Sequence, residues 1–167
     1  RTRFQQMAFL NKGLRITLRD ERPESAYVVD DQSSDAAATQ PHDDFLYERG
    51  LVDYVEYLNK VRKTEVVNDE IIEVESEDTD RHISLELAMQ WTTSYTENVF
   101  TFANTINTHE GGTHEEGFRA ALTTLVNRYA RAQGMLKEKD DNLTGEDIRE
   151  GLTAVISVKL SEPQFEG

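Results

Sequence analysis

The side chains best suited to chemistry in this sequence gather in one short run, His109, Glu110, Gly111, Gly112, Thr113, His114 and Glu115. Imidazole and carboxylate groups are zinc ligands. In the metalloprotease pattern, however, two histidines stand four positions apart on one helix face, whereas His109 and His114 are five apart and enclose a helix-breaking glycine pair. We therefore expect loop and helix-cap structure here rather than a metal site.

The glycine pair of this run also invites a phosphate-binding interpretation, because free backbone amides at a helix start attract anions. No Lys-Ser or Lys-Thr follows Gly112, and the carboxylates of Glu115 and Glu116 would repel a phosphate. We expect Gly111 and Gly112 to permit a tight turn into a helix instead.

Nucleophilic catalysis is not indicated. The chain has no cysteine, and Ser84, Ser157 and the histidines form no triad pattern, since no nucleophile elbow is present. We assign no catalytic residue, no cofactor ligand and no metal ligand.

Basic residues offer one candidate for nucleic-acid contact. Arg119 lies at the edge of the apolar face of a predicted helix, with Arg128 and Arg131 further along, so the three could form a basic stripe; the alternative is a solvated face. The cluster 60–63 lies at a helix end, where cations interact favourably with the helix dipole.

Net charge argues against DNA binding when it is considered alone. The formal charge of -14 would repel a phosphate backbone. About half of it lies in residues 20–44, which hold Arg22 as their one basic residue, show little periodicity and are predicted to be a flexible acidic insertion.

Size and composition predict one folded domain of 167 residues. The lack of cysteine fits a reducing, intracellular setting, and no run approaches the ~20 apolar residues of a membrane span. The first residue is not methionine and the last residues follow a strand-like run, so we expect a fragment of a longer protein.

The positioning elements follow from periodicity. Apolar residues at helical spacing up to Gly13 predict the end of a helix, and alternation over 14–18 predicts a strand. A short strand over 45–47 precedes a helix over about 51–62. Strands are predicted at 71–74, 83–91 and 99–103, and their short connections favour an antiparallel arrangement of these three neighbours.

The second half of the sequence predicts the longest helix. Thr113 and Glu116 match the T-x-x-E capping box, and Gly134 offers a stop. The predicted apolar face comprises Phe118, Ala121, Leu122, Leu125, Val126 and Tyr129. Thr144 and Asp147 repeat a cap-like spacing before a short helix, and alternation over 152–160 predicts a last strand. The fold class is α+β.

Three segments, at 7–13, 102–119 and 143–152, resemble successive signatures of the bacterial DNA gyrase B family. The resemblance runs from Arg1 to Gly167 except for 27–44. It implies a two-layer sandwich of a mixed, mostly antiparallel sheet packed on helices, like the second domain of ribosomal protein S-five. It further implies three regions: the end of a GHKL ATPase-domain helix and a linking strand at 1–19, the insertion at 20–44, and a transducer domain at 45–167.

The resemblance implies that the full protein is a cytoplasmic type II DNA topoisomerase that uses ATP and magnesium. It would pair with DNA gyrase A in a heterotetramer and contact a second copy of gyrase B when ATP binds. It would use the ATP cycle to pass one DNA duplex through a second, cleaved duplex. The family's ATP ligands lie in the preceding domain and in a Gln-Thr-Lys loop that follows a segment like 163–165. Residues 1–167 alone are therefore expected to bind no ATP and to be inactive.

Family motif positions then supply the candidate site residues. By resemblance, Arg119 would face the cavity that admits DNA, and Gly111, Gly112, Thr113 and His114 would belong to the motif that couples ATP to movement of the long helix. Two other interpretations stay open: the corresponding subunit of topoisomerase IV, and an acidic interaction module that docks a basic partner through residues 20–44 without ATP-linked activity.

Overall fold

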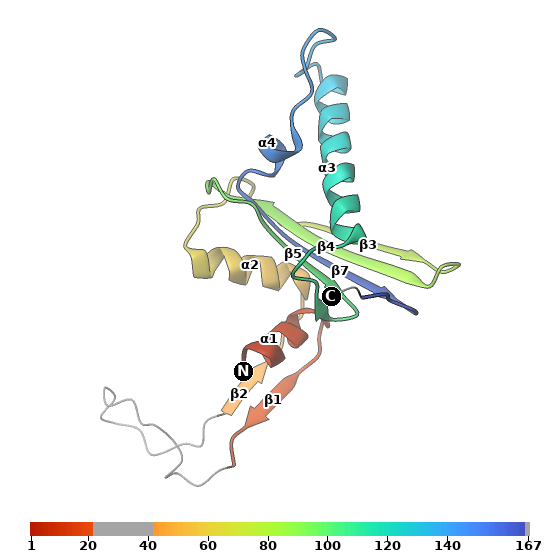
Figure 1. Ribbon diagram of the computed structural model, residues 1–167. Coiled ribbons are helices and arrows are strands. Elements are labelled where there is room, and N and C mark those ends of the chain that lie inside the picture. Colours follow the sequence, from red (N-terminus) through yellow and green to blue (C-terminus); the bar gives the residue numbers. More distant parts are fainter. Residues whose placement is uncertain (22–41, 166–167) are drawn as a thin grey trace. The chain divides into compact units, whose positions relative to one another are not determined.

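The computed structural model describes residues 1–21 and 42–165, and it separates into two compact units, Arg1–Gly50 and Leu51–Gly167 (Figure 1). No helix among the described residues is both long and apolar enough to cross a bilayer.

The first unit consists of one helix and a strand pair. Helix α1 (Thr2–Phe9) is followed by β1 (Ile16–Arg19), which pairs antiparallel with β2 (His42–Phe45). The Phe9 ring stacks on Tyr47 with 3.6 Å between ring centroids. The strand predicted at 14–18 is therefore present, but it begins at Ile16 and ends at Arg19.

Strand β2 corrects two expectations. The strand predicted at 45–47 lies at His42–Phe45 instead, so Asp43 and Asp44 belong to a β-ladder and not to the insertion assigned to 20–44. Their pairing with β1 supplies the backbone hydrogen bonds that a polar sequence alone does not reveal. The rest of the predicted insertion, 22–41, lies outside the described residues.

The second unit is built on a five-stranded sheet. Its strands are β3 (Ile72–Asp78), β4 (Ile83–Trp91), β5 (Asn98–Ala103), β6 (Ile106–Asn107) and β7 (Leu152–Leu160), in the order β3-β4-β7-β5-β6. β7 is antiparallel to β4 and parallel to β5. The predicted adjacency of β4 and β5 is wrong, because the last strand inserts between them after the long crossover that contains α3.

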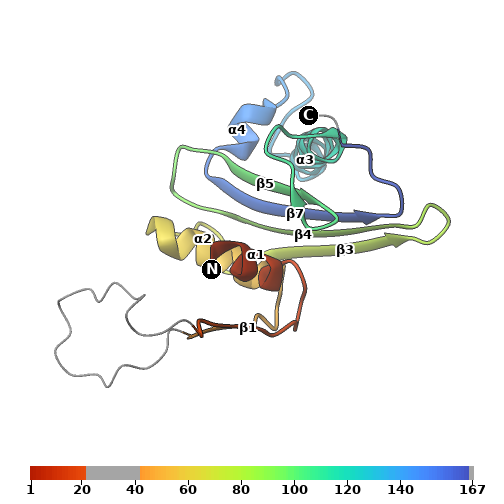
Figure 2. The same cartoon turned by 60° about the horizontal axis from the view of Figure 1, so that its bottom comes forward.

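Helices cover both faces of this sheet. Helix α2 (Leu51–Arg62), whose predicted extent is confirmed, packs on β4 and β7, and buried Asn59 donates to Gln90 over 2.8 Å. Helix α3 (Thr113–Ala132) lies on the opposite side (Figure 2), where Leu122 packs with Met89, Leu152 and Ala154. The α+β class with a mixed, mostly antiparallel sheet packed on helices is confirmed.

Only part of the predicted apolar face of α3 contacts the sheet. Phe118, Leu122 and Val126 pack against the core, whereas Leu125 and Tyr129 are 59% and 61% exposed. Figure 1 shows why: α3 rises steeply from the sheet, so one ridge at i, i+4 and i+8 reaches it. The short helix α4 (Gly145–Arg149) packs beside α3, and its predicted Thr144 cap is confirmed, since the Thr144 hydroxyl accepts from the Asp147 amide over 3.1 Å.

Candidate functional site

The start of α3 carries most of the predicted site residues. The carbonyl of Gly112 accepts the amides of Glu115 and Glu116, each over 3.0 Å, so Gly112 is the N-cap and Thr113 is the first helical residue. The predicted capping box is wrong, because Thr113 lies one position too late to cap and no side chain caps this helix end.

Gly112 is required by its backbone and by its neighbour. Its φ of 153° lies in a region that side chains disfavour, and an added Cβ would stand 2.8 Å from Cε1 of His114. Gly111 also has a positive φ, of 84°. The glycine pair therefore makes the tight turn expected of it and lets the imidazole lie directly over the backbone.

His114 is tied to the sheet through two threonines. Its Nε2 lies 3.1 Å from the Thr108 hydroxyl, which lies 2.6 Å from the hydroxyl of Thr101 on β5. Burial lowers the pKa of His114 below its ordinary value, although the charge of Glu115 opposes that shift. Across residues 1–21 and 42–165, no group of three or more His, Asp or Glu side chains is arranged to hold a metal ion.

Arg119 lies one helical turn beyond Glu115 and is held by two carboxylates. Its Nε and Nη2 donate to Oε1 of Glu115 over 3.0 and 2.8 Å, and its Nη1 lies 2.7 Å from Oε1 of Glu97. Burial opposes the charge, but the hydrogen bonds to Glu115 and the charge of Glu97 outweigh it and raise the pKa of Arg119 above its ordinary value. The arginine is permanently cationic and 35% exposed.

Glu97 also binds a second arginine. The same Oε1 accepts from Nε of Arg149 over 3.1 Å, and the Arg149 side chain is only 10% exposed. Gly145 makes room for it, because an added Cβ there would stand 2.6 Å from Nη1 of Arg149. Neither Glu97 nor Arg149 was predicted to matter. The one signal in the sequence that could have identified Arg149 as a candidate is its position in the short helix directly before the buried β7.

We call Glu97, Glu115, Arg119 and Arg149 the charged cluster. It joins the segment before β5, the first turns of α3 and the end of α4, and its two positive and two negative charges balance. Through Oε2 of Glu115, which accepts from Thr101 over 3.4 Å, the cluster connects to Thr108 and His114. The four members of the cluster include no hydroxyl or thiol nucleophile. What it can do is fix the position and charge of one exposed guanidinium.

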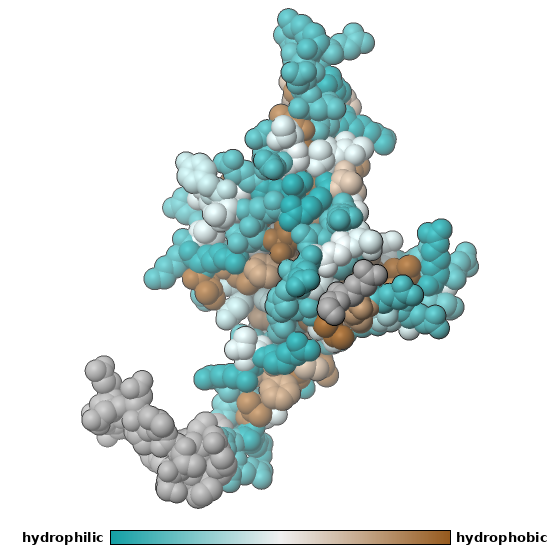
Figure 3. Space-filling view, in the orientation of Figure 1, coloured by the Kyte–Doolittle hydropathy of each residue, from teal (hydrophilic) through white to brown (hydrophobic). Residues whose placement is uncertain are grey.

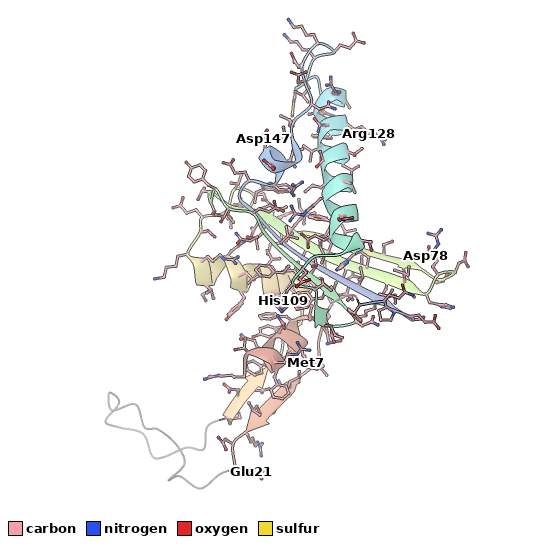
Figure 4. The ribbon with its side chains drawn as sticks, in the orientation of Figure 1. Met7, Glu21, Asp78, His109, Arg128 and Asp147 are labelled. Atoms are coloured by element: carbon pink, nitrogen blue, oxygen red, sulfur yellow. The ribbon has the colours of Figure 1, made fainter. Side chains whose placement is uncertain are left out.

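An open hollow of about 480 Å³ adjoins this cluster, between β5 and the loop before α3. It is lined by Val99, Phe100, Thr101, Asn107, Thr108, His109, Glu110, Gly111 and Glu115. His109, labelled in Figure 4, thus lines the hollow, while His114 is engaged with Thr108. The two histidines of the predicted run have different surroundings.

The basic stripe suggested for α3 does not form. Arg128, labelled in Figure 4, lies on α3 nine positions after Arg119. At about 100° per residue, this separation places the two on opposite sides of the helix. Arg131 is engaged locally: its Nη1 donates to the Lys137 carbonyl over 2.9 Å and its Nη2 to the Asp140 carbonyl over 2.8 Å. Arg119 therefore stands apart from the other two arginines.

Comparison with known proteins gives concordant matches. The family described as DNA gyrase B matches residues 50–167. The DNA gyrase B protein of Micrococcus luteus is 61% identical over 100% of this chain and 26% of its own length, and that of Streptomyces coelicolor is 61% identical over 99% and 24%. The chain spans about a quarter of the length of these curated relatives.

Solved structures agree in fold. The 43K ATPase domain of Thermus thermophilus gyrase B in complex with an aminocoumarin matches with a TM-score of 0.79 and 28% identity, over 99% of this chain and 40% of that one. The topoisomerase IV ATP-binding domain of Francisella tularensis matches with a TM-score of 0.69 at 21% identity, over 99% of this chain and 39% of that one, which shows similarity of fold alone.

Proposed function

The chain belongs to the DNA gyrase B family, and we propose that it is the transducer portion of gyrase B, within a type II topoisomerase. The observation that carries the proposal is the match to a gyrase B ATPase domain over nearly the whole chain, at a TM-score of 0.79. The chain corresponds to 40% of that domain. Its role would be mechanical, linking ATP binding elsewhere in the protein to movement.

The proposal extends to the whole protein as follows. Complete gyrase B would bind ATP and magnesium, form a heterotetramer with gyrase A, contact a second copy of itself when ATP binds, and act on double-stranded DNA in the cytoplasm to introduce negative supercoils. Residues 1–19 would end the GHKL ATPase domain and link it onward, and residues 45–167 would form the transducer. On its own, this chain would neither bind nor hydrolyse ATP.

Within the transducer, the start of α3 would couple the two events. Gly111, Gly112, Thr113 and His114 fix the loop through the His114–Thr108–Thr101 contacts, so a displacement of this loop would move the base of a rigid 20-residue helix. Arg119 would be the residue that senses the DNA duplex, since it is the arginine of α3 whose exposed guanidinium is held at the sheet end of the helix.

Topoisomerase IV remains the second candidate, and the comparisons favour gyrase. The relatives at 61% identity are gyrase B proteins, and the solved structure matched at 28% identity is a gyrase B ATPase domain. The gyrase B relatives at 61% identity disfavour a stand-alone acidic module acting through residues 20–44. Of that stretch the structure describes 20–21 and 42–44, where Asp43 and Asp44 belong to a strand pair.

The test is Arg119→Gln in complete gyrase B, assembled with gyrase A, with ATP turnover measured with and without duplex DNA. We expect DNA stimulation to fall at least tenfold while turnover without DNA is retained, because the sensing contact lies outside the ATP site. Arg128→Gln is the matched control, an arginine on the opposite side of the same helix. Full DNA stimulation in Arg119→Gln would remove the proposed role of this residue.

A further inference from the structure

Arg119 is already occupied in this structure, and its occupants resemble a phosphate in charge and geometry. A guanidinium offers five N–H donors and binds carboxylates and phosphates through the same paired edges. The Nε and Nη2 edge of Arg119 is taken by one oxygen of Glu115, and Nη1 by Glu97. The hydrogen bonds described therefore use three of the five donors.

The two carboxylates differ in what else they hold. Glu97 is shared with Arg149, whose side chain is only 10% exposed, so Glu97 is anchored. Glu115 binds Arg119 and, at the longer distance of 3.4 Å, the Thr101 hydroxyl. Of the two contacts, that of Glu115 is the one that can open while the buried Arg149 keeps its carboxylate, because Arg149 is bound by Glu97.

We infer that Glu115 is an intramolecular substitute for a DNA phosphate at Arg119, and that duplex DNA binds here by displacing it while Glu97 keeps the guanidinium in place. This inference rests on the proposed function, in which Arg119 meets DNA. Glu115 is a positioning residue: it keeps Arg119 neutralised and oriented until a phosphate competes for the same edge. An acidic protein thereby carries a DNA contact that is hidden until the duplex arrives.

Displacement sets the strength of the DNA contact. A phosphate gains the full interaction with Arg119 only after the ion pair with Glu115 opens, and the released carboxylate then repels it from close range. The ion pair is partly exposed and solvent screens it, so the removal of Glu115 should tighten DNA binding by about two- to fivefold. The change should shrink as salt is added, because the groups are partly exposed.

The experiment uses complete gyrase B assembled with gyrase A and measures the concentration of duplex DNA that gives half of the maximal stimulation of ATP turnover. Glu115→Gln removes the competing carboxylate and should lower this concentration about two- to fivefold. Glu116→Gln is the matched control, because Glu116 is exposed on the next position of α3 and its removal changes net charge by the same amount. We expect a smaller change from it.

The decisive comparison is made again in Arg119→Gln, where stimulation of ATP turnover is expected to be weak, so the affinity of the assembled protein for labelled duplex DNA is measured directly in all variants. There the effect of Glu115→Gln should disappear, since the carboxylate has no guanidinium to occupy. Glu115→Ala repeats the measurement with the best helix former in place of the amide. Equal effects of Glu115→Gln and Glu116→Gln, or an effect that persists without Arg119, would overturn the inference and leave the proposed function intact. Normal DNA stimulation in Arg119→Gln alone would overturn both.

Discussion

The two ends of α3 use arginine in opposite ways. At its base, Arg119 and the neighbouring Arg149 of α4 are bound by side-chain carboxylates. One of these, Glu97, is 52 residues from Arg149 in the sequence. At its far end, Arg131 is bound by backbone carbonyls and by Asn142, at most 11 residues away. In Figure 3 this far end, at the top of the view, is covered mainly by hydrophilic residues.

The difference determines what each end can do. Contacts between distant segments hold the base to the sheet, so opening them requires the packing of the unit to change. Local contacts at the far end can open by themselves, at a cost confined to one loop. A signal that enters at the base is therefore expected to move the helix as a whole, which is what a transducing element requires.

Glu97→Ala should have the largest effect on stability. It leaves the buried Arg149 guanidinium without its carboxylate, and removal of one partner from a buried ion pair costs about 3 kcal/mol or more. Urea unfolding of the chain measures the change in the free energy of unfolding. Glu116→Ala is the control, because it removes the same single negative charge. A loss below about 1 kcal/mol would show that the base is no more tightly held than the far end.

Gly112→Ala should have the next largest effect on stability. The added Cβ meets the His114 ring at 2.8 Å and the backbone must keep a φ that disfavours side chains, so we expect a loss of about 1–3 kcal/mol. Gly117→Ala is the matched control, because nothing lies within 4 Å of an added Cβ and alanine is the better helix former. That control should be neutral or slightly stabilising.

Arg131→Gln should have a small and local effect. Its donors satisfy the carbonyls of Lys137 and Asp140, so hydrogen exchange should speed up over the 137–142 loop while global stability changes by about 0.5–1 kcal/mol. Faster hydrogen exchange at the base of α3 as well would show that the two ends of the helix do not open independently.

The pH dependence of stability at the base should be the subtlest signal. Burial lowers the pKa of His114 in the folded state, so the unfolded chain binds its proton first and stability falls as pH drops from 6.5 towards the lowered folded value. His114→Gln should flatten that part of the profile, measured by urea unfolding at several pH values. An unchanged profile would assign the pH dependence to other groups.

Local features of the sequence predicted local structure well. The helix at 51–62, the strand at 83–91 and the Thr144 cap follow from apolar spacing and from a hydroxyl beside free amides, and the structure confirms each. Thr113 misled the prediction because the same capping pattern is also compatible with a cap one residue earlier, at a glycine. The sequence predicted loop and helix-cap structure for the run 109–115, but not its contacts with Thr101 and Thr108.

The sequence by itself thus determined most of the secondary-structure elements, the α+β class and the family, because periodicity and motifs are properties of neighbouring residues. Only the tertiary structure decided that β7 lies between β4 and β5, that Glu97 pairs with Arg149, and that Arg119 is neutralised. The physical reason is that the partner of a charge depends on which elements pack together. Arg119, which the sequence places at the edge of an apolar helix face, is therefore the central member of the charged cluster in the folded chain.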